Sequence, residues 1–177
     1  MKTSTILKVG IPILILASTN VGCNNNDNDT GSSTSNQTSN SSLYEKYGGE
    51  PTIQKIVDDV VTLVTADPVT APYFTVVDQP GHDTTDRLKS CLDLQFTVLF
   101  GGPGTYPSVS HYRNPPSTGY VCVSMTIAHA SLGITSPVFD QFLVDIATVL
   151  KIDGVSDADV NSIAPALLGL KGQIVTQ

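Results

Sequence analysis

The feature that most constrains the fold is a helical spacing of aliphatic residues, which recurs along residues 43–177. After Pro51, a residue tolerated in a first helical turn, apolar side chains return at intervals of three and four. The valines among them favour strands, but the helical period outweighs that weak preference. These residues predict one amphipathic helix, whose buried face consists of Ile53, Ile56, Val57, Val60, Val61 and Val64.

The same spacing predicts further helices along the rest of the chain. Thr135 and Ser156 are residue types that cap helix N-termini, Gly101 is a stop signal, and Pro165 is expected to bend the last helix. The buried face of that helix is expected to extend to Leu168. Because no segment alternates as a strand does, the sequence predicts an all-α domain. The further helices are expected over residues 84–100, 122–131, 135–153 and from 156 on.

Residues 103–121 interrupt the helical pattern with the segment PGTYPSVSHYRNPPSTGYV. It is rich in proline, glycine and serine, which favour turns and loops. A loop of this length within a compact domain is either functional or an insertion.

The N-terminal residues predict export. The apolar run from Val9 to Ala17 is too short to span a membrane and follows Lys2 and Lys8, as in a secretory signal peptide. The small residues before Cys23 resemble a bacterial lipobox, which implies a signal peptide over 1–22 and lipidation of Cys23 as the first mature residue. The alternative is an ordinary signal peptide cleaved near Ala17. Under either interpretation the protein is exported, and the first implies a membrane-anchored lipoprotein facing the periplasm or the cell exterior.

Three segments follow from this pattern. Residues 24–42 contain no apolar side chain, so they cannot bury enough surface to offset the entropy of ordering them. We therefore expect a disordered polar tether over 23–42 and a folded domain over 43–177.

The charge and the cysteines narrow the function further. The formal net charge is −7, which argues against nucleic acid as a partner and against electrostatic docking on a membrane. With Cys23 lipidated, Cys91 and Cys122 remain as an even pair in an oxidising compartment. They form either a disulfide or two buried thiols that pack as small apolar residues.

Four motifs in this domain resemble the group I truncated haemoglobins. Residues 43–49 read LYEKYGG, residues 66–74 contain ADP and APYF, residues 87–103 end in GGP, and residues 125–135 read MTIAHASLGIT. The motifs keep the order and spacing of that family, and only the loop before Met125 is longer than usual.

The resemblance implies a two-over-two helical sandwich around haem, with a diatomic gas, oxygen or nitric oxide, as ligand. His129 occupies the position of the proximal iron ligand, with Met125 and Leu132 as apolar neighbours on the same helix face. The alternative is an ordinary, partly exposed helix histidine. Phe74 matches the phenylalanine that packs on the porphyrin, a role that a generic core aromatic would also fit.

On the distal side the sequence departs from the family. Val61 stands where a tyrosine usually donates a hydrogen bond to bound oxygen, and Leu88 and Leu92 stand where glutamine is common. The loss of a hydrogen bond, worth about 1 kcal/mol, predicts weaker retention of oxygen. The other polar candidates for the pocket or a sixth ligand are Gln95, His82 and His111, and those for the haem propionates are Lys89 and Arg87.

Three functions are compatible with these residues. The first is a haem-binding globin that binds a diatomic gas reversibly at the cell envelope, as in oxygen transport. The second is a haem enzyme of the nitric oxide dioxygenase type, which the apolar distal residues disfavour. The third is a haem-free structural lipoprotein with a degenerate globin fold, which the motif around His129 disfavours.

Overall fold

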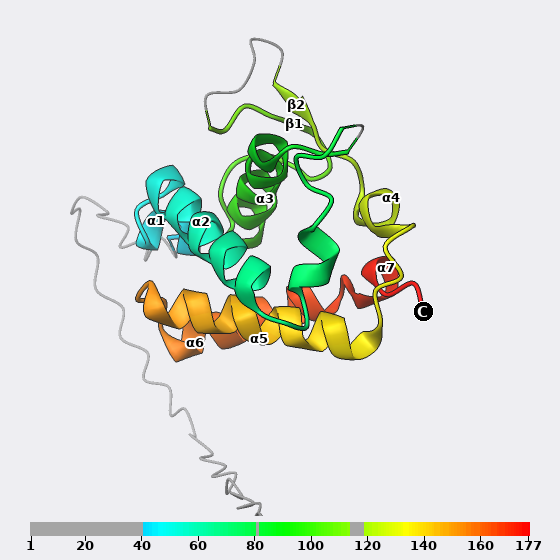
Figure 1. Cartoon of the computed structure of the whole chain (residues 1–177). Coiled ribbons are helices and arrows are strands. Elements are labelled where there is room, and N and C mark those ends of the chain that lie inside the picture. The colour runs from blue at the N-terminus through cyan, green and yellow to red at the C-terminus, as the bar shows by residue number, and fades with distance from the viewer. Residues whose placement is uncertain (1–40, 81, 114–118) are drawn as a thin grey trace, which may run out of the picture. The chain divides into compact units, whose positions relative to one another are not determined.

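A computed structural model describes residues 41–80, 82–113 and 119–177. The predicted signal peptide, Cys23 and residues 23–40 of the predicted tether lie outside these ranges. Within them the chain forms seven helices, one 3-10 turn and one short ribbon (Figure 1). In chain order they are α1 (Leu43–Lys46), α2 (Glu50–Ala66), η1 (Ala71–Phe74), α3 (Thr85–Leu99), β1 (Val109–Ser110), β2 (Tyr120–Val121), α4 (Met125–His129), α5 (Ser136–Ile152), α6 (Asp157–Leu168) and α7 (Lys171–Ile174).

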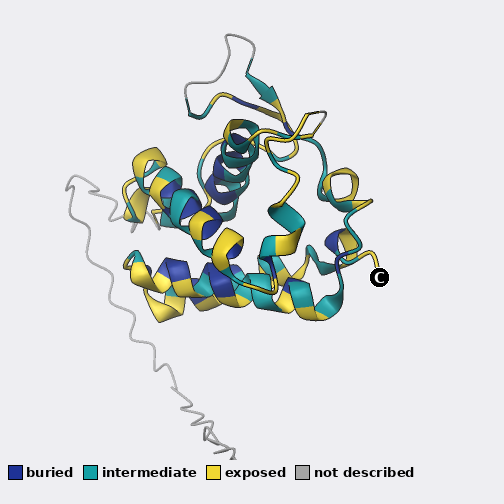
Figure 2. Cartoon of the chain, in the orientation of Figure 1, coloured by how far each residue is buried: buried dark blue, intermediate teal, exposed yellow. Residues whose placement is uncertain are grey.

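The predicted two-over-two helical sandwich is confirmed. Helices α2 and α3 pack on one another, α2 also packs on α5, and α5 packs on α6. The aliphatic face of α2 is buried in one core cluster together with the buried sides of α3 and α5 (Figure 2). The burial of these aliphatic faces is the main force that holds the layers together.

Local signals fix where the helices begin and end. The side chain of Thr84 accepts a hydrogen bond from the backbone of Arg87, and that of Ser156 accepts one from Asp159. Gly101 ends α3 with a φ of 75°, which a side chain would strain. A Cβ atom on Gly102 would lie 2.6 Å from the ring of Tyr44, so only glycine lets α1 approach this closely.

Three expectations about elements were wrong. Residues 103–121 contain an antiparallel ribbon, in which Val109 pairs with Val121. The helix expected from Cys122 begins only at Met125, because the Cys122 N–H donates to the carbonyl of Ser108 and extends the ribbon. Leu168 is 52% exposed, since α6 ends there and its buried face stops short of this residue.

Candidate functional site

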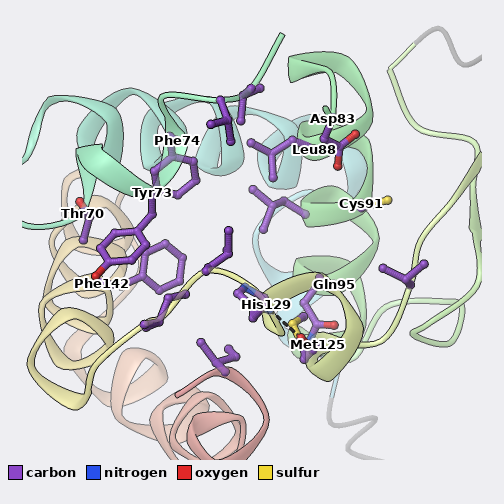
Figure 3. A pocket seen from close by; sticks show the side chains of 18 of the residues that line it. Thr70, Tyr73, Phe74, Asp83, Leu88, Cys91, Gln95, Met125, His129 and Phe142 are labelled. Carbon is purple, nitrogen blue, oxygen red and sulfur yellow. Dashed lines mark hydrogen bonds between the residues drawn. The ribbon is translucent and has the colours of Figure 1, made fainter. Parts of the chain in front are cut away.

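A cavity of about 340 Å³ lies between α3, α4, η1 and α5 (Figure 3). Its volume falls in the range of about 300–1,000 Å³ that small-molecule and cofactor sites occupy. Aliphatic and aromatic side chains make up most of the wall. They are Tyr73, Phe74, Val76, Val77, Leu88, Leu92, Tyr106, Val123, Met125, Leu132, Ile134, Val138, Phe139, Phe142 and Ile174.

His129 lines this cavity from the last residue of α4. Its Nδ1 lies 2.7 Å from the carbonyl oxygen of Met125, one turn back in the helix. Because a carbonyl oxygen only accepts hydrogen bonds, Nδ1 must carry the proton, which leaves the lone pair of Nε2 free in the neutral ring. Histidines that ligate metals are commonly oriented in this way by a backbone carbonyl. The imidazole therefore has Nε2 as its unprotonated nitrogen, the form of the ring that metals bind.

Most residues predicted to hold a cofactor come together here. Phe74 comes from η1, Leu88 and Leu92 from α3, and Met125 and Leu132 from the segment that carries His129. Their side chains surround the histidine with apolar surface, which favours a flat hydrophobic ligand over water.

Two of the predicted residues lie elsewhere. Val61 is 9% exposed and packs in the core with side chains of α2, α3 and α5. Lys89 follows Leu88 by about 100° around α3, so it faces α2, where its Nζ lies 2.8 Å from Asp58. Neither residue lines the cavity.

The polar candidates divide in the same way. Gln95, His82 and Arg87 line the cavity, whereas His111 is exposed beside Gly119 on the ribbon. The Oε1 atom of Gln95 is buried without a hydrogen-bond partner among the described residues. Arg87 donates through Nη1 to Asp83 and through Nη2 to the carbonyl of Val121, 2.6 Å away. It therefore joins the edge of the cavity to the ribbon.

Sequence reasoning missed the contribution of the segment 103–124 to the cavity wall. Tyr106 and Val123 both line the cavity, and the Tyr106 hydroxyl donates to the Val123 carbonyl over 2.9 Å. Cys91, also on the wall, is joined to Cys122 by a disulfide with Cα atoms 5.5 Å apart. The proline-rich composition predicted a loop but carried no signal for the side on which it would pack.

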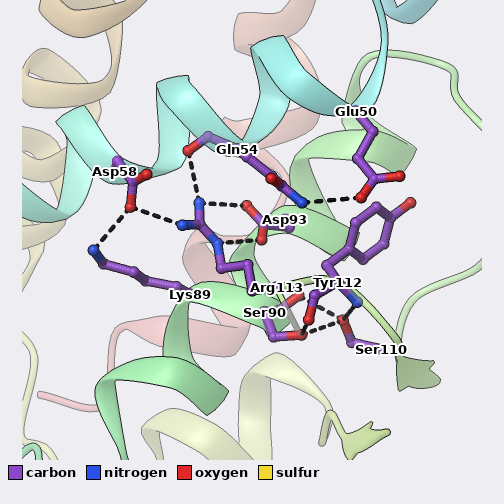
Figure 4. A network of polar contacts seen from close by, with 9 residues as sticks. All are labelled: Glu50, Gln54, Asp58, Lys89, Ser90, Asp93, Ser110, Tyr112 and Arg113. Carbon is purple, nitrogen blue, oxygen red and sulfur yellow. Dashed lines mark hydrogen bonds and ion pairs between the residues drawn. The ribbon is translucent and has the colours of Figure 1, made fainter. Parts of the chain in front are cut away.

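Polar contacts hold the same segment to both α2 and α3 (Figure 4). Arg113 forms a bidentate pair with Asp93, and it also donates to Asp58 over 2.8 Å and to the carbonyl of Gln54 over 2.6 Å. Asp93 is fully buried. Burial raises the pKa of Asp93 to about 6, although the guanidinium of Arg113 acts in the opposite direction.

In the part of the chain that the structure describes, no helix combines the length and apolar character needed to cross a membrane.

Comparisons with known proteins concern the whole domain from residue 42 onward. The family described as "Bacterial-like globin" matches residues 42–176. The group 1 truncated hemoglobin of Tetrahymena pyriformis is 30% identical over 127 residues, which cover 71% of this chain and 87% of that protein. The group 1 truncated hemoglobin GlbN of Nostoc sp. (strain MUN 8820) is 25% identical over 137 residues, which cover 77% of this chain and 99% of GlbN.

Solved structures of truncated hemoglobins have a similar fold. The Fe(III) crystal structure of the Tetrahymena pyriformis truncated hemoglobin superposes with a TM-score of 0.61 and 26% identity, over 77% of this chain and 100% of that one. The 2/2 hemoglobin from Synechococcus sp. PCC 7002 reaches a TM-score of 0.60 over the same shares, with 21% identity, and supports the fold alone.

Proposed function

The chain belongs to the group I truncated haemoglobins of the bacterial-like globin family, and on this premise we propose that it binds a diatomic gas reversibly at the cell envelope. Haem is the cofactor of this family. Bound haem supplies an iron centre with one coordination position left for a gas molecule. The remaining work of binding and orientation belongs to the side chains of the cavity.

The observation that carries the proposal is the hydrogen bond between His129 Nδ1 and the Met125 carbonyl, at the wall of an apolar cavity. It leaves Nε2 as the free donor atom for iron and fixes the plane of the ring. Phe74, Leu88 and Leu92 offer the flat apolar surface that a porphyrin needs. Arg87 lies at the cavity edge, where a guanidinium suits the carboxylates of haem.

The apolar wall also indicates how the gas is held. Leu88 and Leu92 cannot donate a hydrogen bond to a polar ligand such as oxygen, and the lack of a donor at these two positions speeds its release. Nitric oxide depends less on such a donor. We therefore expect reversible uptake of either gas with short retention of oxygen.

The first test is a visible spectrum of the full-length protein reconstituted with haemin. We expect a Soret band that disappears in His129→Ala and persists in His82→Ala and His111→Ala. His82 lines the cavity and His111 does not, so together they control for any nearby imidazole. A protein without a Soret band, or one whose band survives His129→Ala, would contradict the assignment.

The envelope location rests on the N-terminal sequence. The short apolar run and the small residues before Cys23 support export and lipidation at that cysteine. Mass spectrometry of the protein from bacterial membranes tests this: we expect a diacylglyceryl adduct on Cys23, and none in Cys23→Ser. An unmodified N-terminus at Met1 would contradict export.

A further inference from the structure

We propose that the Cys91–Cys122 disulfide is a site of thiol–disulfide exchange whose reduction loosens the cofactor cavity, so that haem retention depends on the redox state of this bond. The inference rests on the proposed function, because it concerns the same cavity. It goes beyond it by assigning a modification site and its reactant, a dithiol reductant. Neither cysteine is needed to bind iron or gas.

The first step is the position of the bond. Cys91 lies on α3 between Leu88 and Leu92 in sequence, and like them it lines the cavity. Cys122 comes directly before Val123, which lines the same cavity. The disulfide therefore joins two stretches of wall that are 31 residues apart in sequence.

The second step is what else holds this stretch of wall. Near Cys122, Arg87 donates through Nε and Nη2 to the Val121 carbonyl, over 3.2 and 2.6 Å. The Tyr106 hydroxyl donates to the carbonyl of Val123. These bonds link exposed or half-buried groups, whose hydrogen bonds contribute little because water competes for them. The Cys122 N–H also bonds to the Ser108 carbonyl within the ribbon, but the disulfide is the covalent attachment of this stretch to α3, so its loss loosens the wall around Val123.

The third step is access. Cys122 is 4% exposed, whereas Cys91 is half-buried and borders the cavity. A thiolate of the reductant attacks the sulfur of Cys91, the S–S bond breaks, and Cys122 leaves as a thiolate that takes up a proton. The second thiol of the reductant then displaces Cys91 from the mixed disulfide. Two protein thiols and one oxidised reductant result.

The fourth step is reciprocity. A cofactor in the cavity would contact the residues that line it, and Cys91 and Val123 are among them. If reduction weakens haem binding by some factor, haem must make the disulfide harder to reduce by the same factor. The coupling can therefore be measured from either side.

The experiment measures haem transfer to apomyoglobin from the ferric full-length protein. We expect the double variant Cys91→Ser/Cys122→Ser to lose haem about tenfold faster than the oxidised wild type, within the range typical of coupled sites. Cys23→Ser is the matched cysteine control and should keep the wild-type rate. Arg113→Met weakens the same segment at its other end with the disulfide intact, so it measures the effect of general destabilisation alone, and its rate should stay well below that of the double variant.

The reciprocal measurement needs no variant of the pair. In dithiol redox buffers, followed by thiol trapping and mass spectrometry, we expect haem to lower the midpoint potential of the disulfide by about 30 mV, the equivalent of a tenfold effect for two electrons. Equal transfer rates with equal midpoints overturn the inference and leave the proposed function standing. So does an Arg113→Met variant that loses haem as fast as the double variant, because the effect is then general destabilisation. A wild-type protein without a Soret band overturns both proposals.

Discussion

Arg113→Met is the substitution whose cost follows most directly from the structure. The guanidinium makes two hydrogen bonds to Asp93, one to Asp58 and one to the carbonyl of Gln54, and its side chain is only 15% exposed. Methionine retains the apolar stem but leaves the Asp93 carboxylate buried without a cation. Breaking a buried ion pair in this way destabilises a fold by about 3–5 kcal/mol.

The cost should depend on pH, because Asp93 can escape it by taking up a proton. Its pKa is raised to about 6 in the folded protein, so at pH 5 the carboxyl is mostly neutral with or without Arg113. The variant then loses hydrogen bonds and the partly exposed ion pair with Asp58, together worth about 1–2 kcal/mol. At pH 8 the wild type holds the ionised pair of Arg113 and Asp93. The variant must either bury the Asp93 carboxylate without a cation or protonate it at a pH above its pKa, and both cost free energy.

Urea unfolding at pH 5 and pH 8, followed by far-ultraviolet circular dichroism, measures both values. Lys89→Met is the matched control, since Lys89 also pairs with Asp58 but is more exposed, and its loss should cost less than about 1 kcal/mol at either pH. A cost for Arg113→Met that is the same at both pH values, or below that of the control at pH 8, would refute the reasoning.

Three further predictions follow from the same geometry. The pKa of Asp93 is about 6 in the folded protein and 3.8 in the unfolded chain, so protonation of Asp93 stabilises the fold by up to about 3 kcal/mol below pH 4. This stabilisation is lost as the pH rises through 6. Asp93→Asn should therefore flatten the pH dependence of the free energy of unfolding in urea between pH 4 and 7. Leu92→Gln places a hydrogen-bond donor on the cavity wall, so stopped-flow measurements should show oxygen dissociating about fivefold more slowly, whereas Leu92→Met should leave the rate nearly unchanged. Gly102→Ala forces a Cβ atom into the ring of Tyr44, so thermal unfolding should show that the free energy of unfolding falls by about 1–3 kcal/mol. Gly172→Ala is the control, because a Cβ atom there meets no other atom within 4 Å, and it should not show this loss.

The sequence predicted most of the layers because aliphatic periodicity determines which face of a long helix is buried. The buried face of α2 follows it closely, and the motif around His129 pointed to a residue that lines the cavity. The ribbon could not be found in this way, because each strand has two residues and alternation needs more. For Val61 the period predicted a buried position on α2, but spacing along one helix does not determine which side chains of other helices it meets.

The position of His129 depends on residues outside its own helix. Helix α4 has five residues and none of them is buried, and so short a helix is not stable alone. Its packing on α7 and the contacts of Met125 and Leu132 with the second apolar cluster hold it on one side. On the other side, its N-terminal cap Ser124 is only two residues beyond Cys122, where the disulfide fixes the chain to α3. A ligand that binds only the folded site stabilises it in proportion to the logarithm of its concentration over Kd, so haem and the disulfide act on the same weakly supported segment. The position of Nε2 in the cavity is therefore determined by residues 122–129 as one unit, rather than by His129 alone.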